Sequence, residues 1–529
     1  MLHIGFLKSP MKTDLDIKPL IGLAGVLIMA MASEFNDQVS SAAIADVLGG
    51  LHLSHDPGTW IQSLYVSAEV MGMLLAPWSA MTFSSRRFVL FVISLNAVST
   101  LLIPTTSSIP VIYGLRILQG LAGGLSIPLL MATALRFLSP PIRVYGLACY
   151  ALTATFTPNM AQTITALWVD VVGWHFVFLQ AIPLCVSAGM LAWYGLPQDP
   201  VLLDRLKRFD WRGFLLALIG LGSLSTMLQQ GDRLDWFNSP AICVMALLSV
   251  VATPLLVINE WFHPLPLFKP QLLARRNLAY GLIALFLFLL IGLSASSLPT
   301  SYLQEIQGLR PIQMFPVTLT VAASQIVLLP LIAKLLDYEW ADARIVSFVG
   351  LSFILIACIG SSFVNVTWNR DQFYVWQAFQ ALGQPLVVMS LLLMATNSIK
   401  AEEGQFGASL FNTPRAISEA TGTWLIQLID RRRGTLHTDR LWDQAGNHRY
   451  SILQANPLMP QHPTPLLPNG LERSSGSLSA FSKAIQQQAT VMTISDSYLI
   501  IAGLTVCLMI VLMVLPVRTL PPRIQLAKK

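Results

Sequence analysis

Long apolar runs, separated by short polar segments, recur along almost the whole chain. An apolar run of roughly 20 residues is long enough for one helix to cross the hydrocarbon core of a bilayer. By this rule the sequence predicts fourteen membrane-spanning helices, and therefore an all-α integral membrane protein. Their expected limits are 19–42, 58–80, 88–105, 109–136, 145–168, 175–197, 213–231, 239–260, 279–303, 312–334, 345–365, 373–396, 406–428 and 497–516.

The Lys and Arg residues indicate how these helices are oriented. They gather in alternate connecting segments and at both ends of the chain, whereas the intervening short segments hold only Arg233, Arg310 and Arg370. In membrane proteins the cytoplasmic segments carry the excess of basic residues. Both termini are therefore predicted to be cytoplasmic, which requires an even number of spans. A cleavable signal peptide ending near Ala30-Met31-Ala32 is an alternative for the first span.

One outside segment, 429–496, is much longer than the others and is rich in Pro, Gly, Ser and Gln. Within it, residues 477–491 are expected to form an amphipathic helix that leads into the last span. The five prolines of 454–470 argue against regular structure there. The segment is either a linker or a docking surface for another envelope protein.

The composition excludes several other classes of protein. Hydrophobic residues make up 54% of the 529 residues and charged residues only 11%, against about 25% charged in soluble proteins. The net charge is +6, but the basic residues do not form the patch expected of a nucleic-acid-binding protein. The five cysteines are far apart, so we predict neither a disulfide nor a metal site from them. His52 and His55 are interpreted as surface residues, with a zinc site as the alternative.

Six ionisable residues within the predicted spans are the candidate functional residues. A carboxylate at the centre of a bilayer costs about 2.5–3.5 kcal/mol by insertion scales, so such residues usually face an interior cavity and serve a function. Residues three or four apart share a helix face, which applies to two pairs of the six. The candidates are Glu34 and Asp37 in the first span, Glu69 in the second, Arg116 in the fourth, and Arg415 and Glu419 in the thirteenth.

Structural roles are the alternatives for these residues. Glu34 is either functional or paired with Arg116, and Asp37 either carries a proton or lies in a wet vestibule. Arg116 is either the fixed partner of a carboxylate or a substrate contact. Arg415 and Glu419, four apart, are either functional or an ion pair within one helix. Two further acids, Glu260 and Glu305, stand at predicted helix ends and are interpreted as solvated.

Four segments resemble motifs of the major facilitator transporters. LRILQGLAGGLSIP in the fourth span resembles R-x-x-Q-G-x-x-x-G followed by a proline, with Arg116, Gln119, Gly120, Gly124 and Pro128 at the matching positions. The segments GTWIQSLYVSA (58–68), GWHFVFLQAIP (173–183) and FNTPRAISEATGTW (411–424) resemble the second, sixth and thirteenth helices. With fourteen spans and a long outside segment before the last, the chain resembles the fourteen-spanner drug:proton antiporters of the EmrB/QacA type.

The resemblance implies a major facilitator fold, in which two six-helix bundles are joined by two extra transmembrane helices. Residues 1–212 would form the first bundle, 213–278 the extra helices, and 279–529 the second bundle with the large periplasmic loop 429–496. The implied function is the export of toxic amphiphilic small molecules across the bacterial inner membrane by alternating access. The proton gradient would drive export, with no cofactor and no enzymatic activity. The long loop further implies a periplasmic membrane-fusion adaptor and an outer-membrane channel as partners.

Three departures from the family pattern qualify this reading. Segment 76–87 lacks the acid and the glycines of the family's loop between helices 2 and 3, and 161–166 lacks the proline of the fifth-helix antiporter motif. Asn36 stands where the family has an aspartate, so Glu34 or Asp37 is expected to take its place. The substrate cavity is expected to be lined by aromatic residues and Met. The alternatives are a membrane scaffold or sensor that transports nothing, or an exporter of one endogenous metabolite.

Overall fold

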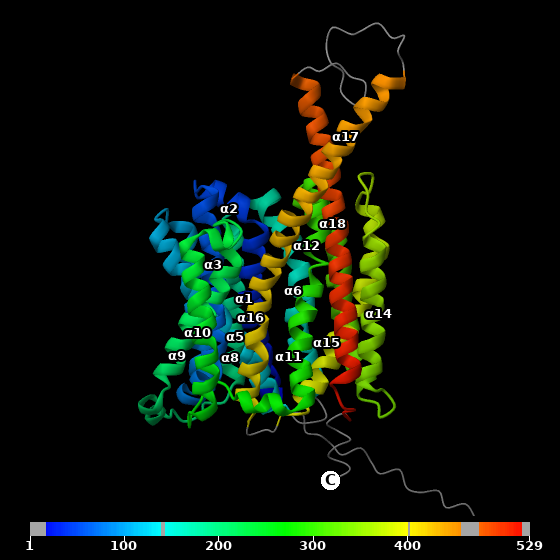
Figure 1. Ribbon diagram of the computed structural model, residues 1–529. Coiled ribbons are helices and arrows are strands. Elements are labelled where there is room, and N and C mark those ends of the chain that lie inside the picture. Colours follow the sequence, from blue (N-terminus) through cyan, green and yellow to red (C-terminus); the bar gives the residue numbers. More distant parts are fainter. Residues whose placement is uncertain (1–16, 139–142, 400–402, 456–474, 521–529) are drawn as a thin grey trace, which may run out of the picture.

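The computed structural model describes residues 17–138, 143–399, 403–455 and 475–520, and every regular element in these ranges is a helix (Figure 1). Twelve helical segments are long and apolar enough to cross a membrane. They are α1 (Ile17–Ala42), α3 (His55–Phe83), α4 with η1 (Ser85–Thr105), α5 (Ile109–Phe137), α7 with α8 (Phe176–Gly195), α9 (Trp211–Gln230), α10 (Pro240–Phe262), α11 with α12 (Arg276–Glu305), α13 (Pro311–Leu336), α14 (Ala343–Ser361), α15 (Arg370–Thr396) and α18 (Ser475–Val514).

Two further helices, α6 (Arg143–Leu167) and α16 (Gly404–Ile429), are as long as these but more polar. α6 packs against α1 and α13, and α16 packs against α3, α5 and α11. Their neighbours are therefore mainly other helices, so they can carry polar side chains at membrane depth. With them, the described residues contain fourteen such segments, the number that the sequence predicts. The helix α17 (Thr435–Ala455) has 21 residues but is strongly polar and is not counted among them.

The helices associate in two groups. In the first bundle, α1, α3, α4, α5, α6 and α8 pack against one another; in the second, α11, α13, α14, α15, α16 and α18 do so. The remaining pair, α9 and α10, pack together, and α9 also lies against α3 and α16. The two bundles meet along α6–α13, α6–α15, α3–α16 and α5–α16.

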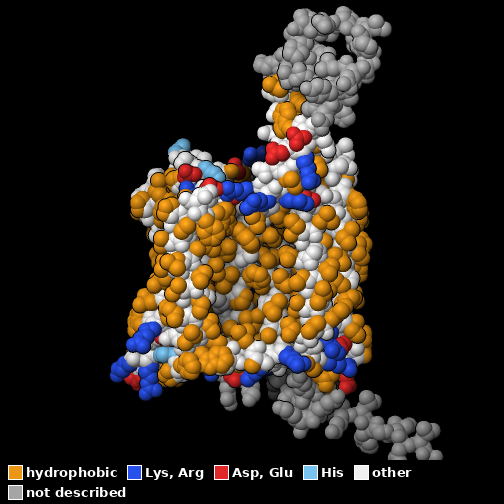
Figure 2. All heavy atoms as spheres, in the orientation of Figure 1, with side chains coloured by type: hydrophobic (Ala, Val, Ile, Leu, Met, Phe, Trp, Pro, Cys, Tyr) orange, Lys and Arg blue, Asp and Glu red, His pale blue; other side chains and the backbone are white. Residues whose placement is uncertain are grey.

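The outer surface carries a broad apolar band between two charged ends (Figure 2). Apolar side chains exposed on the long helices include Val250 on α10, Ile326 on α13 and Met513 on α18, each more than half exposed. A lipid-facing helix is expected to expose apolar residues in this way, because the hydrocarbon core offers no hydrogen-bond partners. The pattern identifies an integral membrane protein.

The two charged ends of the molecule differ. The first described helix begins, and the last one ends, at one end, which we call the terminal face; α17 (Thr435–Ala455) projects from the other, the α17 face (Figure 1). Near the terminal face Asn277 bonds to Val517, and the side chain of Asn397 donates to the carbonyl of Leu520. These contacts hold the residues that follow α18 against the start of α11 and the end of α15.

The last span differs from its predicted limits of 497–516. α18 is one continuous helix of 40 residues, so the predicted helix at 477–491 is confirmed and runs without a break into the span. The π-helical turn η7 (Asp430–Gly434) and α17 add helical structure that the polar composition did not predict. Of the proline-rich stretch 454–470, residues 456–470 lie outside the described residues.

The interpretation of Glu260 as a solvated residue was wrong. Its side chain at the end of α10 is fully buried, and Oε2 accepts hydrogen bonds from the backbone N–H groups of Leu267 (2.6 Å) and Phe268 (3.3 Å). The chain after α10 folds back over the helix end, so the carboxylate faces backbone donors instead of water. Glu305 is exposed, as expected, and so are His52 and His55.

Candidate functional site

A cavity of about 340 Å³ lies between the two bundles. Its wall is built by α1, α3, α6, α9, α11, α15 and α16, so both bundles and one of the extra helices contribute to it. Small-molecule sites usually occupy about 300–1,000 Å³, which this cavity matches. The polar and ionisable residues in the wall are Glu34, Gln38, Ser41, Gln62, Glu69, Asn159, Gln229, Ser296, Ser297, Gln384, Arg415, Ser418, Glu419, Thr423 and Gln427.

The cavity lies toward the α17 face. On α1 and α16, which both run from the terminal face to the α17 face, the lining residues fall in the second half of the helix, at 34–41 and 415–427. Two lining residues near these helix ends, Ser41 and Thr423, are exposed. The cavity therefore reaches the molecular surface at the α17 face.

On the opposite side of the cavity the bundles are in direct contact. The hydroxyl of Tyr150 on α6 donates to the side-chain oxygen of Asn412 on α16 (2.6 Å), and the amide of Asn412 contacts the sulfur of Met131 on α5 (3.7 Å). The Ser409 hydroxyl on α16 donates to the carbonyl of Met73 on α3. All four helices contribute buried residues here, which closes the path from the cavity to the terminal face.

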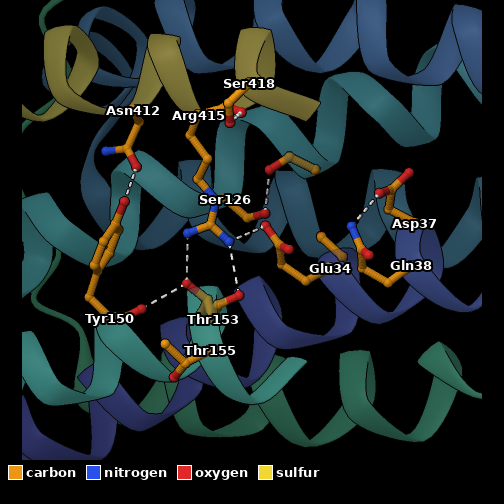
Figure 3. Close-up of polar contacts among 12 residues, drawn as sticks. Glu34, Asp37, Gln38, Ser126, Tyr150, Thr153, Thr155, Asn412, Arg415 and Ser418 are labelled. Atoms are coloured by element: carbon orange, nitrogen blue, oxygen red, sulfur yellow. Dashed lines mark hydrogen bonds and ion pairs between the residues drawn. The ribbon is translucent and has the colours of Figure 1, made fainter. Parts of the chain in front are cut away.

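An ion pair joins the bundles at the floor of the cavity. The guanidinium of Arg415 on α16 lies 2.7 Å from Oε1 of Glu34 on α1, and it also donates to the hydroxyl (3.0 Å) and carbonyl (2.9 Å) of Thr153 on α6 (Figure 3). Glu34 and Arg415 are both less than a tenth exposed. The alternatives in which Glu34 pairs with Arg116, or Arg415 with Glu419, are wrong: these side chains point to other partners.

Two more carboxyl groups face the same cavity. Glu69 on α3 is 4% exposed, and its Oε2 has no hydrogen-bond partner among the described residues. Glu419 on α16 is half-buried in the wall and lies close enough to Asp37 and Glu69 to interact with them electrostatically. The site thus places several carboxyl groups within mutual repulsion, which weakens when one of them binds a proton.

Asp37 lies behind the cavity wall. It is 3% exposed, and its two oxygens accept hydrogen bonds from the side-chain amides of Gln62 (2.8 Å) and Gln38 (3.1 Å). Gln38 and Gln62 themselves line the cavity. Asp37 therefore contacts two cavity-lining amides and also interacts with Glu419. Because its side chain is buried, the wet vestibule position considered from the sequence does not describe it.

Arg116 is fully buried and has no direct contact with a carboxylate in the described part of the chain. Its guanidinium donates to the side-chain oxygens of Gln119 (2.7 Å), Gln62 (3.0 Å) and Ser40 (3.2 Å) and stacks over the ring of Tyr65. In this structure Arg116 has no direct carboxylate partner among the described residues and does not line the cavity. Its role as a substrate contact stays a prediction. The Arg116 guanidinium holds the side-chain oxygen of Gln62, and the amide nitrogen of Gln62 donates to Asp37.

Asn36, at the position of the family aspartate, points away from the cavity. Its side-chain amide donates to Thr100 (2.9 Å) and Asn96 (3.2 Å) on α4, and Gln119 also donates to Thr100 (3.0 Å). Gln119 is therefore a packing residue of the first bundle. On α1 the carboxylate that faces the cavity is Glu34, two residues earlier in the chain.

The other motif residues of α5 hold the helices together. A Cβ atom on Gly120 would lie 2.1 Å from the carbonyl oxygen of Tyr65, and one on Gly124 would lie 2.0 Å from that of Glu69. Pro128 is buried within the helix. Only glycine permits this approach of α3 to α5, and the approach positions Glu69 for the cavity.

The expectation of a wall rich in aromatic residues and Met was wrong for the described residues. Phe288 is the one aromatic side chain in the wall, and no Met lines it, whereas five glutamines do. Other Met and aromatic side chains instead fill the contacts between helices, as Met29 and Phe411 do in the core. The glutamines were missed, although Gln62 and Glu69 are seven residues apart and so share a helix face.

The fold and this site define a membrane transporter. The chain matches the family model of the Major Facilitator Superfamily over residues 26–423 and belongs to that superfamily. Among solved structures it is similar to the proton:xylose symporter XylE, with a TM-score of 0.52 at 12% identity over 97% of this chain and 99% of that one. This likeness shows the fold.

Among relatives of known name, the chain is 28% identical to the multidrug export protein EmrB of Haemophilus influenzae over 418 residues, which is 76% of this chain and 79% of that protein. It is 24% identical to the fatty acid resistance protein FarB of Neisseria gonorrhoeae over 443 residues, 80% of this chain and 85% of that protein.

Proposed function

We propose that this protein is a proton-driven exporter of amphiphilic small molecules of the multidrug type. The observation that carries the proposal is the ion pair between Arg415 and Glu34, which joins the two bundles at the floor of a cavity closed on one side. The similarity to multidrug export proteins supports the substrate class.

The terminal face is proposed to be cytoplasmic, in the inner membrane of a bacterium. Basic residues are concentrated in the segments that meet this face, as the distribution of Lys and Arg across a membrane requires. In this orientation the cavity faces outward, so the structure is the state that releases substrate and takes up protons.

Glu34 is proposed to couple proton uptake to the movement of the bundles. A proton that enters the cavity from outside and binds Glu34 removes its charge, so Arg415 is left with a neutral partner. A buried charge without its counter-ion is unstable, so the contact between the bundles weakens. The bundles can then rock about the central site, as in alternating access, and Glu34 releases its proton on the other side.

Glu69 and Glu419 are proposed to share in the proton exchange. Their carboxyl groups line the same cavity, and each neutral form relieves the repulsion from its neighbours. One proton that moves down a potential of 100 mV supplies about 2.3 kcal/mol. In a one-for-one exchange this supports roughly a 50-fold gradient of a neutral substrate.

The wall suits a substrate with both apolar and hydrogen-bonding parts. Phe288, Leu289 and Leu293 contribute apolar surface from α11 and its end, and the glutamines and carboxyl groups contribute polar surface elsewhere in the wall. α17 and the first turns of α18 project on the side to which the cavity opens (Figure 1). We propose this projection as the place where a periplasmic adaptor, and through it an outer-membrane channel, would receive the substrate.

Transport in proteoliposomes tests the proposal. With the terminal face outward, an acid lumen should drive uptake of a fluorescent amphiphile such as ethidium, together with loss of protons from the lumen. Glu34→Gln should lower gradient-driven uptake to the level of protein-free liposomes. The matched control, Glu305→Gln, makes the same change at an exposed position outside the cavity and should leave uptake intact.

Two outcomes count against the proposal. If Glu34→Gln, Glu69→Gln and Glu419→Gln each retain normal uptake and normal proton loss, the coupling residues are wrongly assigned. If the unmodified protein moves none of a panel of cationic, neutral and anionic amphiphiles under any gradient, it is not a multidrug exporter.

A further inference from the structure

A second cavity, of about 690 Å³, lies outside the central one, at the ends of α9 and α16 nearest the α17 face. We call it the interfacial pocket. Its aromatic residues are Trp236 and Phe237 of the short helix η4 (Trp236–Asn238) and Trp424 of α16, and its basic residues are Arg431 and Arg432 of η7. The wall of the central cavity, by contrast, has a single aromatic ring, Phe288, and a single guanidinium, Arg415, among the described residues.

The interfacial pocket lies at the edge of the apolar band. Phe237 is 67% exposed, Trp236 and Trp424 are half-buried, and the rings of these two Trp residues meet edge to face with centroids 6.4 Å apart. Basic side chains follow the upper rim of the band in Figure 2. Trp side chains are typical of the headgroup level of a bilayer, so the pocket faces lipid and water together.

The two arginines differ in whether an acidic side chain neutralises their charge. Arg431 forms ion pairs with Asp232 and Asp235 on the connection between α9 and α10. Arg432 is exposed and has no acidic partner among the described residues. Arg432 therefore gives the pocket an unneutralised guanidinium, the group that binds carboxylate and phosphate oxygens in a bidentate fashion.

The backbone between α9 and α10 holds the ring of Trp236 in place. Asp235 and Trp236 both have left-handed backbone angles, with φ values of 57° and 50°, which are unfavourable for residues other than glycine. The N–H of Trp236 donates to the carbonyl of Gly231 (2.8 Å), and its ring packs where a Cβ of Gly231 would be. The strained conformation turns the Trp236 ring toward Trp424, which shapes the apolar half of the pocket.

We propose that the interfacial pocket binds an amphiphile with one anionic headgroup. Arg432 contacts the carboxylate or phosphate, and Trp236 and Trp424 contact the apolar tail. Such a molecule comes either from the phospholipids of the surrounding leaflet or from single-chain acids. The proposal concerns binding and does not depend on transport.

The pocket is a neighbour of the central cavity. Leu228 and Trp424 line the pocket, whereas the adjacent residues Gln229 and Thr423 line the central cavity. The contact between α9 and α16 therefore separates the two spaces. A bound amphiphile would therefore lie beside α16, which belongs to the second bundle and moves with it if that bundle rocks.

Photo-crosslinking of the full-length protein in phosphatidylcholine nanodiscs tests the proposal. The probes carry the same diazirine-labelled acyl chain on three headgroups: phosphatidylglycerol, phosphatidylcholine and a free fatty acid. Crosslinked peptides are mapped by mass spectrometry. We expect residues 227–238 and 424–435 to be labelled by anionic probes and not by phosphatidylcholine. Arg432→Gln should lower this labelling about fivefold.

The matched control is Arg433→Gln, the same change at the next residue, which pairs with Asp496 and does not line the pocket. It should leave labelling unchanged. Labelling by phosphatidylglycerol alone identifies a lipid as the ligand, labelling by the fatty acid alone identifies a single-chain acid, and both results support the proposal. Equal labelling by phosphatidylcholine, no labelling of these peptides, or labelling insensitive to Arg432→Gln would overturn it.

Discussion

At the scale of single residues, Arg415 makes the most extensive polar contact described between the two bundles. Its side chain crosses from α16 to Glu34 on α1 and to Thr153 on α6, so three helices meet at one guanidinium. A buried ion pair adds little stability relative to apolar residues, but removing one partner is costly. The arrangement suits a contact that has to be broken and remade in each cycle.

Replacing Glu34 by Gln should therefore destabilise the protein. Arg415 keeps its charge inside the molecule without its counter-ion, for which the expected loss is about 3–5 kcal/mol. In detergent the melting temperature should fall, and the double variant Glu34→Gln with Arg415→Gln should recover part of it. An unchanged melting temperature for Glu34→Gln would show that the pair is not the contact described here.

The sequence predicts which charged residues matter but not how they pair. Glu34, Glu69, Arg415 and Glu419 are conspicuous because charges are rare inside apolar runs. The partners Glu34 and Arg415 are 381 residues apart, and nothing local distinguishes this pair from Arg415 with Glu419. The sequence also does not show that the Asn36 side chain faces α4, because this depends on how α1 is rotated about its axis.

At the scale of helices, the close contact of α3 and α5 sets the position of Glu69. The glycine spacing of α5 predicts close packing from the sequence, and the structure places the backbone of α3 against Gly120 and Gly124. The limits of most spans were predictable because apolar runs end at polar residues, with the start of α18 as an exception. α17 was not, because an exposed polar helix lacks that signal.

Gly124→Ala should separate these helices. The new methyl group would lie 2.0 Å from the carbonyl oxygen of Glu69, so we expect a loss of about 1–3 kcal/mol from overpacking and a marked loss of transport. Gly114→Ala is the control on the same helix, since no atom lies within 4 Å of its Cβ position. It should be neutral or stabilising by about 0.5–1 kcal/mol. Equal melting temperatures for the two variants would contradict this prediction.

At the scale of the whole molecule, the cavity and the closed contact beneath it define one state of a cycle. No periodicity of a single helix specifies which side is closed, because closure depends on how two bundles are tilted against each other. The sequence accordingly predicts the fold and the ionisable residues that line the cavity. The glutamines of the wall and the direction in which the cavity opens became apparent only from the structure.

Crosslinking α5 to α16 on the closed side of the cavity, where Met131 meets Asn412, should stop transport. The five native cysteines are first replaced. Met131→Cys and Asn412→Cys then place two thiols at the contact between α5 and α16. A short bifunctional thiol reagent should join them and block uptake, and a cleavable version of the reagent should allow recovery on reduction. Either single cysteine treated alike is the control. Continued transport by the crosslinked protein would show that this contact does not open.

The continuity of α18 has a mechanical consequence. At 1.5 Å per residue its 40 residues extend about 60 Å, roughly twice the thickness of the hydrocarbon core. The half of α18 nearest the terminal face packs against α11 and α14 of the second bundle, and its first turns project beside α17 (Figure 1). If the second bundle tilts by a few degrees in the proposed cycle, the projecting end of this single straight helix is expected to move by several ångströms relative to the first bundle.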